Sequence, residues 1–297
     1  MSEADVQYKK IINKIINDGY SNKGEHVRTV WKDGEPAYTK SIVAQSMHFS
    51  NKEVPILTTK KVAWKTAIRE LLWIWQKKSN NVEELRQMNV QIWNEWEQED
   101  GTIGKAYGYQ LGKRNRTYQV KNLDVALLDP KHKTVSGETI LIDQVDYLIQ
   151  ELKSNPSSRR HITMLWNPDE LDEMSLTPCV YETQWHVKGN KLHLEVRCRS
   201  NDMGLGNPFN VFQYNVLQRM IAQVTGYELG EYHFHIGDAH IYERHTEPLQ
   251  QQVGRAEFQA PELVINPEIT SFYDFTMNDF QLLNYQFGEK VQMEIAI

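Results

Sequence analysis

Two alternating segments joined by a short turn constrain the fold more than any other part of the chain. The turn is KGNK, residues 188–191, whose glycine and asparagine suit a two-residue hairpin connection. One face of the flanking strands is then consistently apolar, which fixes their register. The predicted facing pairs are Val187 with Leu192, Trp185 with Leu194, Thr183 with Val196, Tyr181 with Cys198, and Cys179 with Ser200.

Apolar periodicity predicts helices over residues 61–77, 142–153 and 211–225. The first helix has apolar residues on nearly every side, so we expect it to be buried almost all round. The second ends at Asn155 before a proline, and the third ends at Gly226. Helices and antiparallel strands in unequal blocks favour an α+β fold.

Length and composition predict one ordinary globular enzyme-sized domain, residues 1–297. Hydrophobic residues make up 40% of the chain and charged residues 24%, which is enough to bury a sizeable core. Residues 115–138 are polar and irregular, and we expect a variable insert there. The net charge of −6 argues against a protein that binds long nucleic acid, although it allows a small phosphorylated ligand.

The cysteine count and the hydropathy pattern bear on the compartment. The two cysteines form no disulfide framework and suit a reducing environment. The chain has no signal-like N-terminus and no uncharged apolar run of about 18 residues. We therefore expect a soluble cytoplasmic protein with no membrane partner.

Cys179 is a candidate nucleophile, whereas Cys198 is expected to be an inert buried thiol. Cys198 alternates with the apolar residues of its strand, as a core residue does. The predicted hairpin brings Cys179 next to Arg199, and a nearby guanidinium favours a thiolate. From this pattern alone, Cys179 could also be a small apolar group at the end of a sheet.

The stretch RSNDMGLGNPFN, residues 199–210, holds more hydrogen-bonding groups than a simple connection needs. Loops carry functional residues disproportionately. However, Asn210 also suits the N-cap of the helix that it precedes, and Ser200 and Asp202 suit turns. The polar members of the stretch are Arg199, Ser200, Asn201, Asp202 and Asn210.

Other charged and aromatic residues are open to two interpretations. Three arginines could bind an anion through their guanidinium groups, or could lie on a solvated surface: Arg28, and the neighbouring pair Arg159 and Arg160. Glu70 falls between Trp73 and Ile74 on the first helix. A carboxylate there would be desolvated, with a raised pKa that suits proton transfer, unless it forms an ion pair at the helix edge.

Two further segments complete the candidates. Trp93 and Trp96, in IWNEW, could belong to the core or form an aromatic wall for a flat ligand. Residues 232–245 are rich in histidine, but their spacing matches no helical zinc motif and offers no Glu placed as a hydrolytic base. We therefore expect no metal.

The order of these signals along the chain resembles the thymidylate synthase family. The matching segments are VPILTTKK, ELLWIW, IWNEW, AYGYQ, SSRRHI, LTPC, RSNDMGLGNPFN and GDAHIY. The resemblance runs from about Arg28 to the C-terminus. It implies a homodimer built on a large bent mixed sheet covered by helices. It also implies a methyltransferase that converts dUMP to dTMP with 5,10-methylenetetrahydrofolate, with no obligatory nucleic acid.

The resemblance also implies roles for individual residues. Cys179 resembles the nucleophile that adds to uracil C6, Glu70 the carboxylate that relays protons, and Tyr107 a group that assists C5 deprotonation. Asn210 resembles the amide that reads the pyrimidine edge. The implied phosphate ligands are Arg28, Arg199, Ser200 and, from the partner subunit, Arg159 and Arg160. His240 and Tyr242 resemble the residues that contact the sugar. The stretch 199–202, which includes Asn201, resembles a nucleotide-binding segment. The implied folate contacts are Trp93, Trp96, Asp202 and Ala296. The resemblance also implies that Lys60 belongs to a mobile segment near the site.

Three positions depart from the family pattern, and three other functions stay open. Many relatives have His where this chain has Val180, Gln where it has Cys198, and His where it has Ala63. These departures bear on the fine tuning of the site and on folate contacts, and they leave the nucleophile and the reaction unchanged. The alternatives are a nucleotide hydroxymethylase of the same superfamily, a metal-dependent hydrolase and a non-enzymatic nucleotide-binding regulator. The Asn210 amide offers an acceptor for N3–H and a donor for O4 of uracil. A cytosine edge has the reverse pattern of donors and acceptors, which argues against a cytosine substrate.

Overall fold

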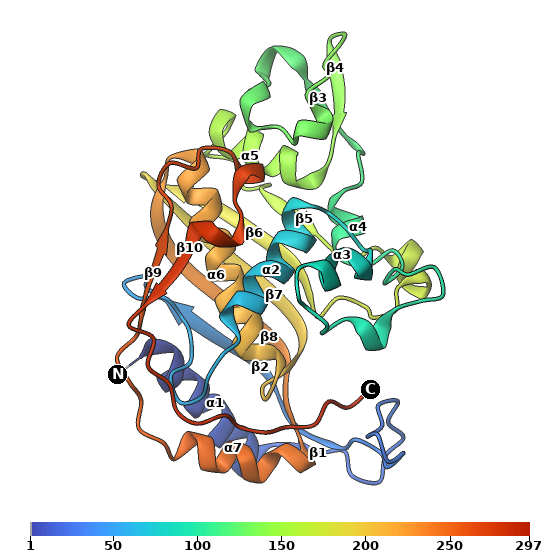
Figure 1. Ribbon diagram of the computed structural model, residues 1–297, viewed down its shortest axis with the longest axis vertical. Helices are drawn as coiled ribbons and strands as arrows, with labels where there is room; N and C mark the ends of the chain where they lie inside the picture. The colour runs from blue at the N-terminus through green and yellow to red at the C-terminus, as the bar shows by residue number, and fades with distance from the viewer. Residues whose placement is uncertain (1) are drawn as a thin grey trace.

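The computed structural model describes residues 2–297 and centres on a mixed β-sheet (Figure 1). Six strands of the described chain form it in the order β1-β2-β8-β7-β6-β5. β7 and β8 run parallel, and every other neighbouring pair is antiparallel. These strands are β1 (Tyr20–Ser21), β2 (Thr39–Phe49), β5 (Ile162–Met164), β6 (Val180–Lys188), β7 (Lys191–Asp202) and β8 (Glu228–Tyr242).

Helices cover one face of this sheet, which confirms the predicted α+β class. α1 and α6 pack against the strands, and α2 packs on α6 (Figure 1). The helices are α1 (Glu3–Asp18), α2 (Trp64–Leu71), α3 (Val82–Gln87), α4 (Gly108–Leu111), α5 (Gln144–Ser154), α6 (Gly206–Thr225) and α7 (Thr246–Val253). Within residues 2–297, no helix combines the length and the apolar character needed to cross a membrane.

The predicted helices form, but two of their boundaries differ. The first is α2 followed by a π-helical turn, Leu72–Gln76, whose residues Trp73 and Trp75 are fully buried, as expected. The third, α6, begins at Gly206 and not at residue 211. Asp202 Oδ1 accepts hydrogen bonds from the N–H groups of Gly204 (2.7 Å) and Leu205 (3.3 Å), so the chain already turns there. Pro208 is tolerated because a first-turn N–H has no helical acceptor.

The hairpin prediction is correct for most of its length and wrong at its functional end. Val187 pairs with Leu192 and Trp185 with Leu194, as predicted. A bulge near Tyr181 then shifts the register by one residue, so that Cys198 pairs with Val180 and not with Tyr181. A bulge adds one residue to one strand, which no alternation pattern reveals.

Residues 115–138 belong to a small lobe at the top of Figure 1. Its strands β3 (Arg116–Gln119) and β4 (Thr139–Ile142) pair with each other. Its own apolar cluster consists of Tyr118, Leu128, Ile140 and Ile142. A second small pair, β9 (Glu262–Ile265) with β10 (Phe280–Leu283), lies near the end of the chain.

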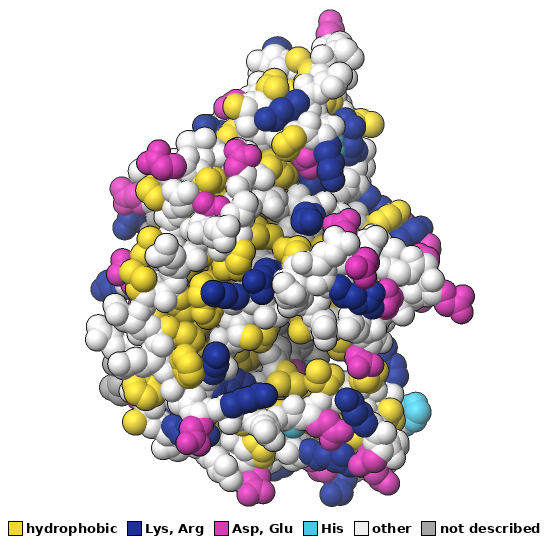
Figure 2. All heavy atoms as spheres, in the orientation of Figure 1, with side chains coloured by type: hydrophobic (Ala, Val, Ile, Leu, Met, Phe, Trp, Pro, Cys, Tyr) yellow, Lys and Arg dark blue, Asp and Glu magenta, His cyan; other side chains and the backbone are white. Residues whose placement is uncertain are grey.

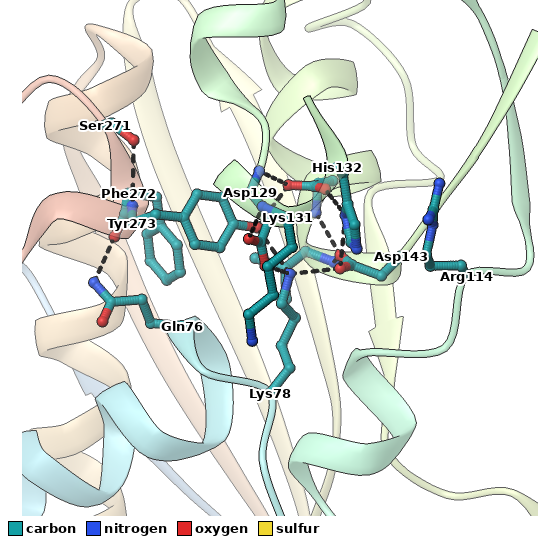
Figure 3. A network of polar contacts seen from close by, with 12 residues as sticks. Gln76, Lys78, Arg114, Asp129, Lys131, His132, Asp143, Ser271, Phe272 and Tyr273 are labelled. Carbon is teal, nitrogen blue, oxygen red and sulfur yellow. Dashed lines mark hydrogen bonds and ion pairs between the residues drawn. The ribbon is translucent and has the colours of Figure 1, made fainter. Parts of the chain in front are cut away.

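Buried charges fasten the lobe to the body of the protein (Figure 3). Lys78 Nζ lies 2.6 Å from Asp129 Oδ2 in the lobe and 2.5 Å from Asp143 Oδ2 at the start of α5. His132 Nδ1 lies 2.7 Å from Asp146 Oδ2, and the Tyr273 hydroxyl donates to Asp146 Oδ1 at 2.6 Å. Two carboxylates thus share one ammonium group at the joint, and the third, Asp146, is held by His132 and Tyr273.

Candidate active site

The backbone of Cys179 is fixed from two sides. Its carbonyl accepts a hydrogen bond from the N–H of Arg199 (2.8 Å), and its N–H donates to the Tyr107 hydroxyl (3.3 Å). Because of the bulge, Cys179 lies opposite Arg199 and not opposite Ser200 as predicted. The Arg199 side chain holds the preceding residues, since Nε donates to the Pro178 carbonyl (3.0 Å) and Nη2 to Thr177 Oγ1 (2.8 Å).

The surroundings of Cys179 favour the protonated form of its thiol. Burial is the largest influence and raises the pKa of the thiol, and the carboxylate of Asp202 raises it further. Arg199 acts in the expected direction and lowers this pKa, but it does not outweigh burial. The predicted effect of Arg199 on the pKa of Cys179 therefore has the right sign, but the sequence does not show the larger effect of desolvation.

Tyr107 is held in a strained backbone conformation beside the cysteine. Its φ of 46° lies in a region that a bulky side chain rarely adopts. The next residue must be Gly108, because a Cβ there would lie 2.2 Å from the Ser79 carbonyl oxygen. Burial raises the pKa of Tyr107 well above its usual value, with a smaller contribution from Cys179. The hydroxyl therefore stays protonated.

Glu70 is a buried carboxylate with two donors and no cation. Its Oε1 accepts a hydrogen bond from Trp93 Nε1 (2.6 Å), and its Oε2 accepts one from Gln213 Nε2 (2.8 Å). Burial raises the pKa of Glu70, while the two hydrogen bonds lower it to a smaller extent. The predicted desolvated carboxylate is present. Its suggested ion pair at the helix edge is absent among the described residues.

Aromatic rings form one side of this group. The Trp93 ring makes edge contacts with Tyr107 (5.1 Å between centroids) and with Trp96 (5.6 Å). Trp93 is buried, whereas Trp96 is only half-buried. Trp93 therefore serves both as core and as a donor to Glu70, and Trp96 offers the more open ring surface.

A chain of amides orients Asn210. Asn207 Nδ2 donates to Asn201 Oδ1 (2.8 Å), and Asn201 Nδ2 donates to Asn210 Oδ1 (3.0 Å). Asn210 lies inside the first turns of α6, so it is not the N-cap that its sequence position suggested. Because its oxygen accepts a hydrogen bond from Asn201, the orientation of the Asn210 amide is defined.

Asp202 and Lys60 lie together under the C-terminal segment. Lys60 Nζ donates to the Gly204 carbonyl (2.5 Å). Burial lowers the pKa of Lys60 to about 8, and Asp202 opposes this shift. His245 Nε2 lies 2.8 Å from the Glu294 carbonyl, which anchors the tail.

The last residues return to the loop that carries Arg28. The backbone of Ile297 exchanges two hydrogen bonds with Val30, of 2.7 and 2.9 Å. This pairing places the segment with Ala296 close to residues 28–30. Arg28 is exposed, and its charge lowers the pKa of Tyr242, although burial dominates and raises that pKa to about 12.

β8 brings the predicted sugar contacts to the same end of the sheet. His240 is the parallel-strand neighbour of Asp202, and Ser200 is the neighbour of Asp238. His240 Nδ1 lies 3.0 Å from Asp238 Oδ1, and its ring contacts that of Tyr242 edge-on, with 5.6 Å between the ring centroids. His233 and His235 instead lie on the open face of the sheet, where His235 pairs with Glu195.

Arg159 and Arg160 are not part of this assembly within one chain. Both are exposed and precede β5, the edge strand of the sheet. Figure 2 shows Lys and Arg side chains among hydrophobic ones near the centre of the face that carries α2 and the C-terminal segment. A net charge of −6 therefore coexists with local positive charge.

The carboxylates around Lys78 could be mistaken for a metal site. Asp129, His132 and Asp143 bring their ligand atoms within 4.8 Å of one another. However, the Lys78 ammonium already lies between the two carboxylates, as Figure 3 shows. These residues also lie in the lobe joint and not beside Cys179.

Two residues of the site were not predicted from the sequence. Gln213 binds Glu70, and His245 holds the tail. Gln213 could have been found, because it follows Asn210 by three positions and so shares its helical face. No comparable pattern identifies His245.

Comparisons with known proteins identify the family of the chain. The model of the family "Thymidylate synthase" matches residues 6–297. Thymidylate synthase 1 of Bacillus subtilis strain 168 and the thymidylate synthase of Bacillus phage phi3T are each 63% identical over 298 residues, covering 100% of both chains. The solved structure of thermostable thymidylate synthase A from Bacillus subtilis matches with a TM-score of 0.89 and 63% identity, covering 99% of each chain. The chain therefore belongs to the thymidylate synthase family.

Proposed function

We propose that this chain makes dTMP from dUMP by reductive methylation, with Cys179 as the nucleophile. The observation that carries the assignment is the geometry of Cys179, whose backbone is fixed by hydrogen bonds with Arg199 and Tyr107. The Tyr107 ring in turn contacts Trp93, which donates to the buried carboxylate of Glu70. The co-substrate 5,10-methylenetetrahydrofolate supplies the one-carbon unit and a hydride, and leaves as dihydrofolate.

Binding of the nucleotide follows from charge and hydrogen bonding. Arg199 Nη1 makes no hydrogen bond within residues 2–297, so it can bind a phosphate oxygen together with Arg28 and Ser200. His240 and Tyr242 bind the deoxyribose hydroxyl. Asn201 holds Asn210, whose amide pairs with the O4 and N3 edge of uracil.

The chemistry uses proximity and charge stabilisation. The Sγ of Cys179, once its proton has passed to water, forms a bond to C6 as the C5–C6 double bond opens, and charge develops on O4 beside the Asn210 amide. C5 then forms a bond to the one-carbon unit of the folate. Loss of the C5 proton, assisted by Tyr107, breaks the bond between this carbon and the folate nitrogen and leaves an exocyclic methylene on the base. Hydride transfer from the folate to this methylene makes the methyl group as the S–C6 bond breaks, which frees Cys179 and releases dihydrofolate. Glu70 holds and relays protons, while Trp93, Trp96, Asp202 and Ala296 contact the folate.

We further propose a homodimer in which Arg159 and Arg160 of the partner subunit reach the phosphate. The open face of the sheet supports this, because it carries a hollow of about 720 Å³ whose lining includes Trp166 and Tyr181 together with Arg199. Contiguous exposed apolar surface commonly marks a protein interface. The exposure of both arginines on one chain agrees with a role across it.

The remaining proposals concern the domain and the compartment. Residues 1–297 form one catalytic domain, and 115–138 form a variable insert, supported by the separate cluster of the lobe. The cytoplasm suits the two free cysteines, since reducing conditions keep a nucleophilic thiol active.

Replacement of the nucleophile tests the proposed reaction. We expect Cys179→Ala to abolish turnover and to leave dUMP binding largely intact, because the phosphate and base contacts lie on other residues. Product nucleotide is identified by mass after incubation with dUMP and methylenetetrahydrofolate, and dUMP affinity is measured by calorimetry. A hydroxymethylated product would reveal hydroxymethylase chemistry.

Cys198→Ala is the matched control for this experiment. Cys198 is buried in the strand that faces the core, so its replacement should preserve turnover. Normal turnover by Cys179→Ala would refute the mechanism.

A further inference from the structure

Arg219 is an arginine without a carboxylate partner on the middle of α6. Burial alone lowers its pKa to about 10, and no Asp or Glu of the described chain pairs with its guanidinium. A charge that is partly buried without compensation is costly, so an arginine is seldom kept in such a place without an anion. Arg219 takes no part in the reaction proposed above.

A buried amide network fixes one edge of this guanidinium. Arg219 Nε donates to Asn215 Oδ1 (2.8 Å), and Asn215 Nδ2 donates to Asn51 Oδ1 (2.6 Å). Asn51 Nδ2 donates in turn to Gln218 Oε1 (2.9 Å). Asn215 and Gln218 are fully buried, so the orientation of Arg219 is set by the core and not by solvent.

The opposite edge of the guanidinium is nearly free. Nη2 makes one long hydrogen bond of 3.5 Å to the Glu53 carbonyl, and Nη1 makes none within residues 2–297. The Glu53 carboxyl group is not the missing partner, because it accepts from the backbone N–H of Glu3. Burial raises the pKa of Glu53, which further weakens it as a counter-ion.

Arg219 lines a polar hollow of about 740 Å³ between α6, the loop after β2, and the β9–β10 pair. Its walls include Lys52, Gln259, Asn284 and Gln286, which are exposed and hold donors suited to an anion. Glu262 also lines it, but that side chain is exposed. Figure 1 shows β9 and β10 at the edge of the molecule, away from the C-terminal residues that cover the proposed catalytic site.

We propose that this hollow, the Arg219 pocket, binds a small polar anion whose phosphate or carboxylate group lies on the free edge of Arg219. A guanidinium edge with two N–H donors matches two oxygens of either group. Lys52 adds a second positive charge at the mouth. Asn284 and Gln286 bind the polar remainder of the ligand.

Titration of anions into the intact protein and its variants tests the proposal. The probes are inorganic phosphate and citrate, followed by calorimetry and thermal unfolding in a buffer free of other polyvalent anions. We expect one binding component in the wild type to be at least about tenfold weaker in Arg219→Gln, because a charge-assisted contact is lost. Comparison of the affinities for phosphate and citrate identifies the preferred acceptor group, phosphate or carboxylate.

Arg114→Gln is the matched control, since Arg114 is an exposed arginine outside the hollow that donates only to the Leu141 carbonyl. It should bind both anions as the wild type does. The difference in anion affinity between the wild type and Arg219→Gln is measured without dUMP. It therefore reports on the Arg219 pocket and not on the nucleotide phosphate site, which is the same in both proteins. Failure of the proposed catalysis would leave this result unchanged.

Two results would overturn the proposal. One is that the wild type and Arg219→Gln bind phosphate and citrate with the same affinities. The other is a loss of thermal stability in Arg219→Gln that is the same with and without anion, which would assign Arg219 a structural role only. If Arg219→Gln does not fold, Arg219→Lys retains a cation without the fork, and unchanged anion affinity in that variant would equally reject the proposal.

Discussion

At the scale of single residues, the effects on Cys179 and Asn210 arise from neighbours that are distant in the sequence. The pKa of Cys179 rises because burial outweighs the nearby guanidinium of Arg199. A phosphate bound to Arg199 would not by itself favour the thiolate, since it neutralises that guanidinium. In the proposed dimer, Arg28 and the arginines from the partner subunit would supply the further positive charge that balances the nucleotide.

Asn210→Asp tests the recognition of the base. The Asn201 amide already donates to the oxygen at this position, so a carboxylate keeps that contact but loses the NH₂ donor for uracil O4. A cytosine edge offers a donor there instead. We expect the ratio of kcat/KM for dUMP to that for dCMP to fall at least about tenfold.

Steady-state kinetics with both nucleotides measures this ratio. Asn115→Asp, at an exposed position of the insert, is the control and should leave it unchanged. An unaltered ratio in Asn210→Asp would remove the base-reading role from this amide.

At the scale of elements, small irregularities aim the functional groups. The bulge near Tyr181 turns the end of β6 so that Cys179 faces Arg199, and the early start of α6 places Asn210 within a helix. The positive φ of Tyr107 brings its hydroxyl to the Cys179 N–H. Each irregularity is stabilised by a specific hydrogen bond rather than by local preference.

Lys78→Met tests the joint between the lobe and the body. Removing the ammonium leaves the buried carboxylates of Asp129 and Asp143 without their shared counter-ion. We expect the free energy of unfolding to fall by about 3–5 kcal/mol, as for other broken buried ion pairs. Urea denaturation measures the loss, and hydrogen exchange should increase in residues 115–138.

Lys77→Met is the neighbouring control. Lys77 is exposed, and its Nζ lies 3.9 Å from Glu84, so a change within about 0.5 kcal/mol is expected. Equal effects of the two substitutions would show that the Lys78 cluster does not hold the lobe.

At the scale of the whole molecule, one chain holds an incomplete set of the proposed phosphate ligands. Arg199, Ser200 and Arg28 lie at the same end of the sheet, whereas Arg159 and Arg160 lie beside the edge strand β5. A symmetric dimer would complete both sites at once, since each subunit lends what the other lacks.

Mixing inactive subunits tests this completion. Cys179→Ala and the double variant Arg159→Ala with Arg160→Ala should each have little activity alone. After subunit exchange, half of the dimers are mixed and one of their two sites is intact. Activity should therefore recover to roughly a quarter of the wild-type value.

Assays before and after exchange measure the recovery. As a control, Cys179→Ala mixed with Cys179→Ser should stay inactive, because no site regains a thiol. A mixture no more active than the sum of its components would contradict the donation of arginines between subunits.

Local patterns in the sequence determined the elements and the order of the motifs along the chain. Alternation predicted the hairpin, apolar periodicity predicted the helices, and Glu70 could be recognised as a desolvated carboxylate because its helix is apolar all round. The tertiary structure decided the bulge at Tyr181, the amide chain through Asn201, the partners Gln213 and His245, and the balance between burial and Arg199 at Cys179. These depend on contacts between segments far apart in the sequence, whose free energies no local pattern contains.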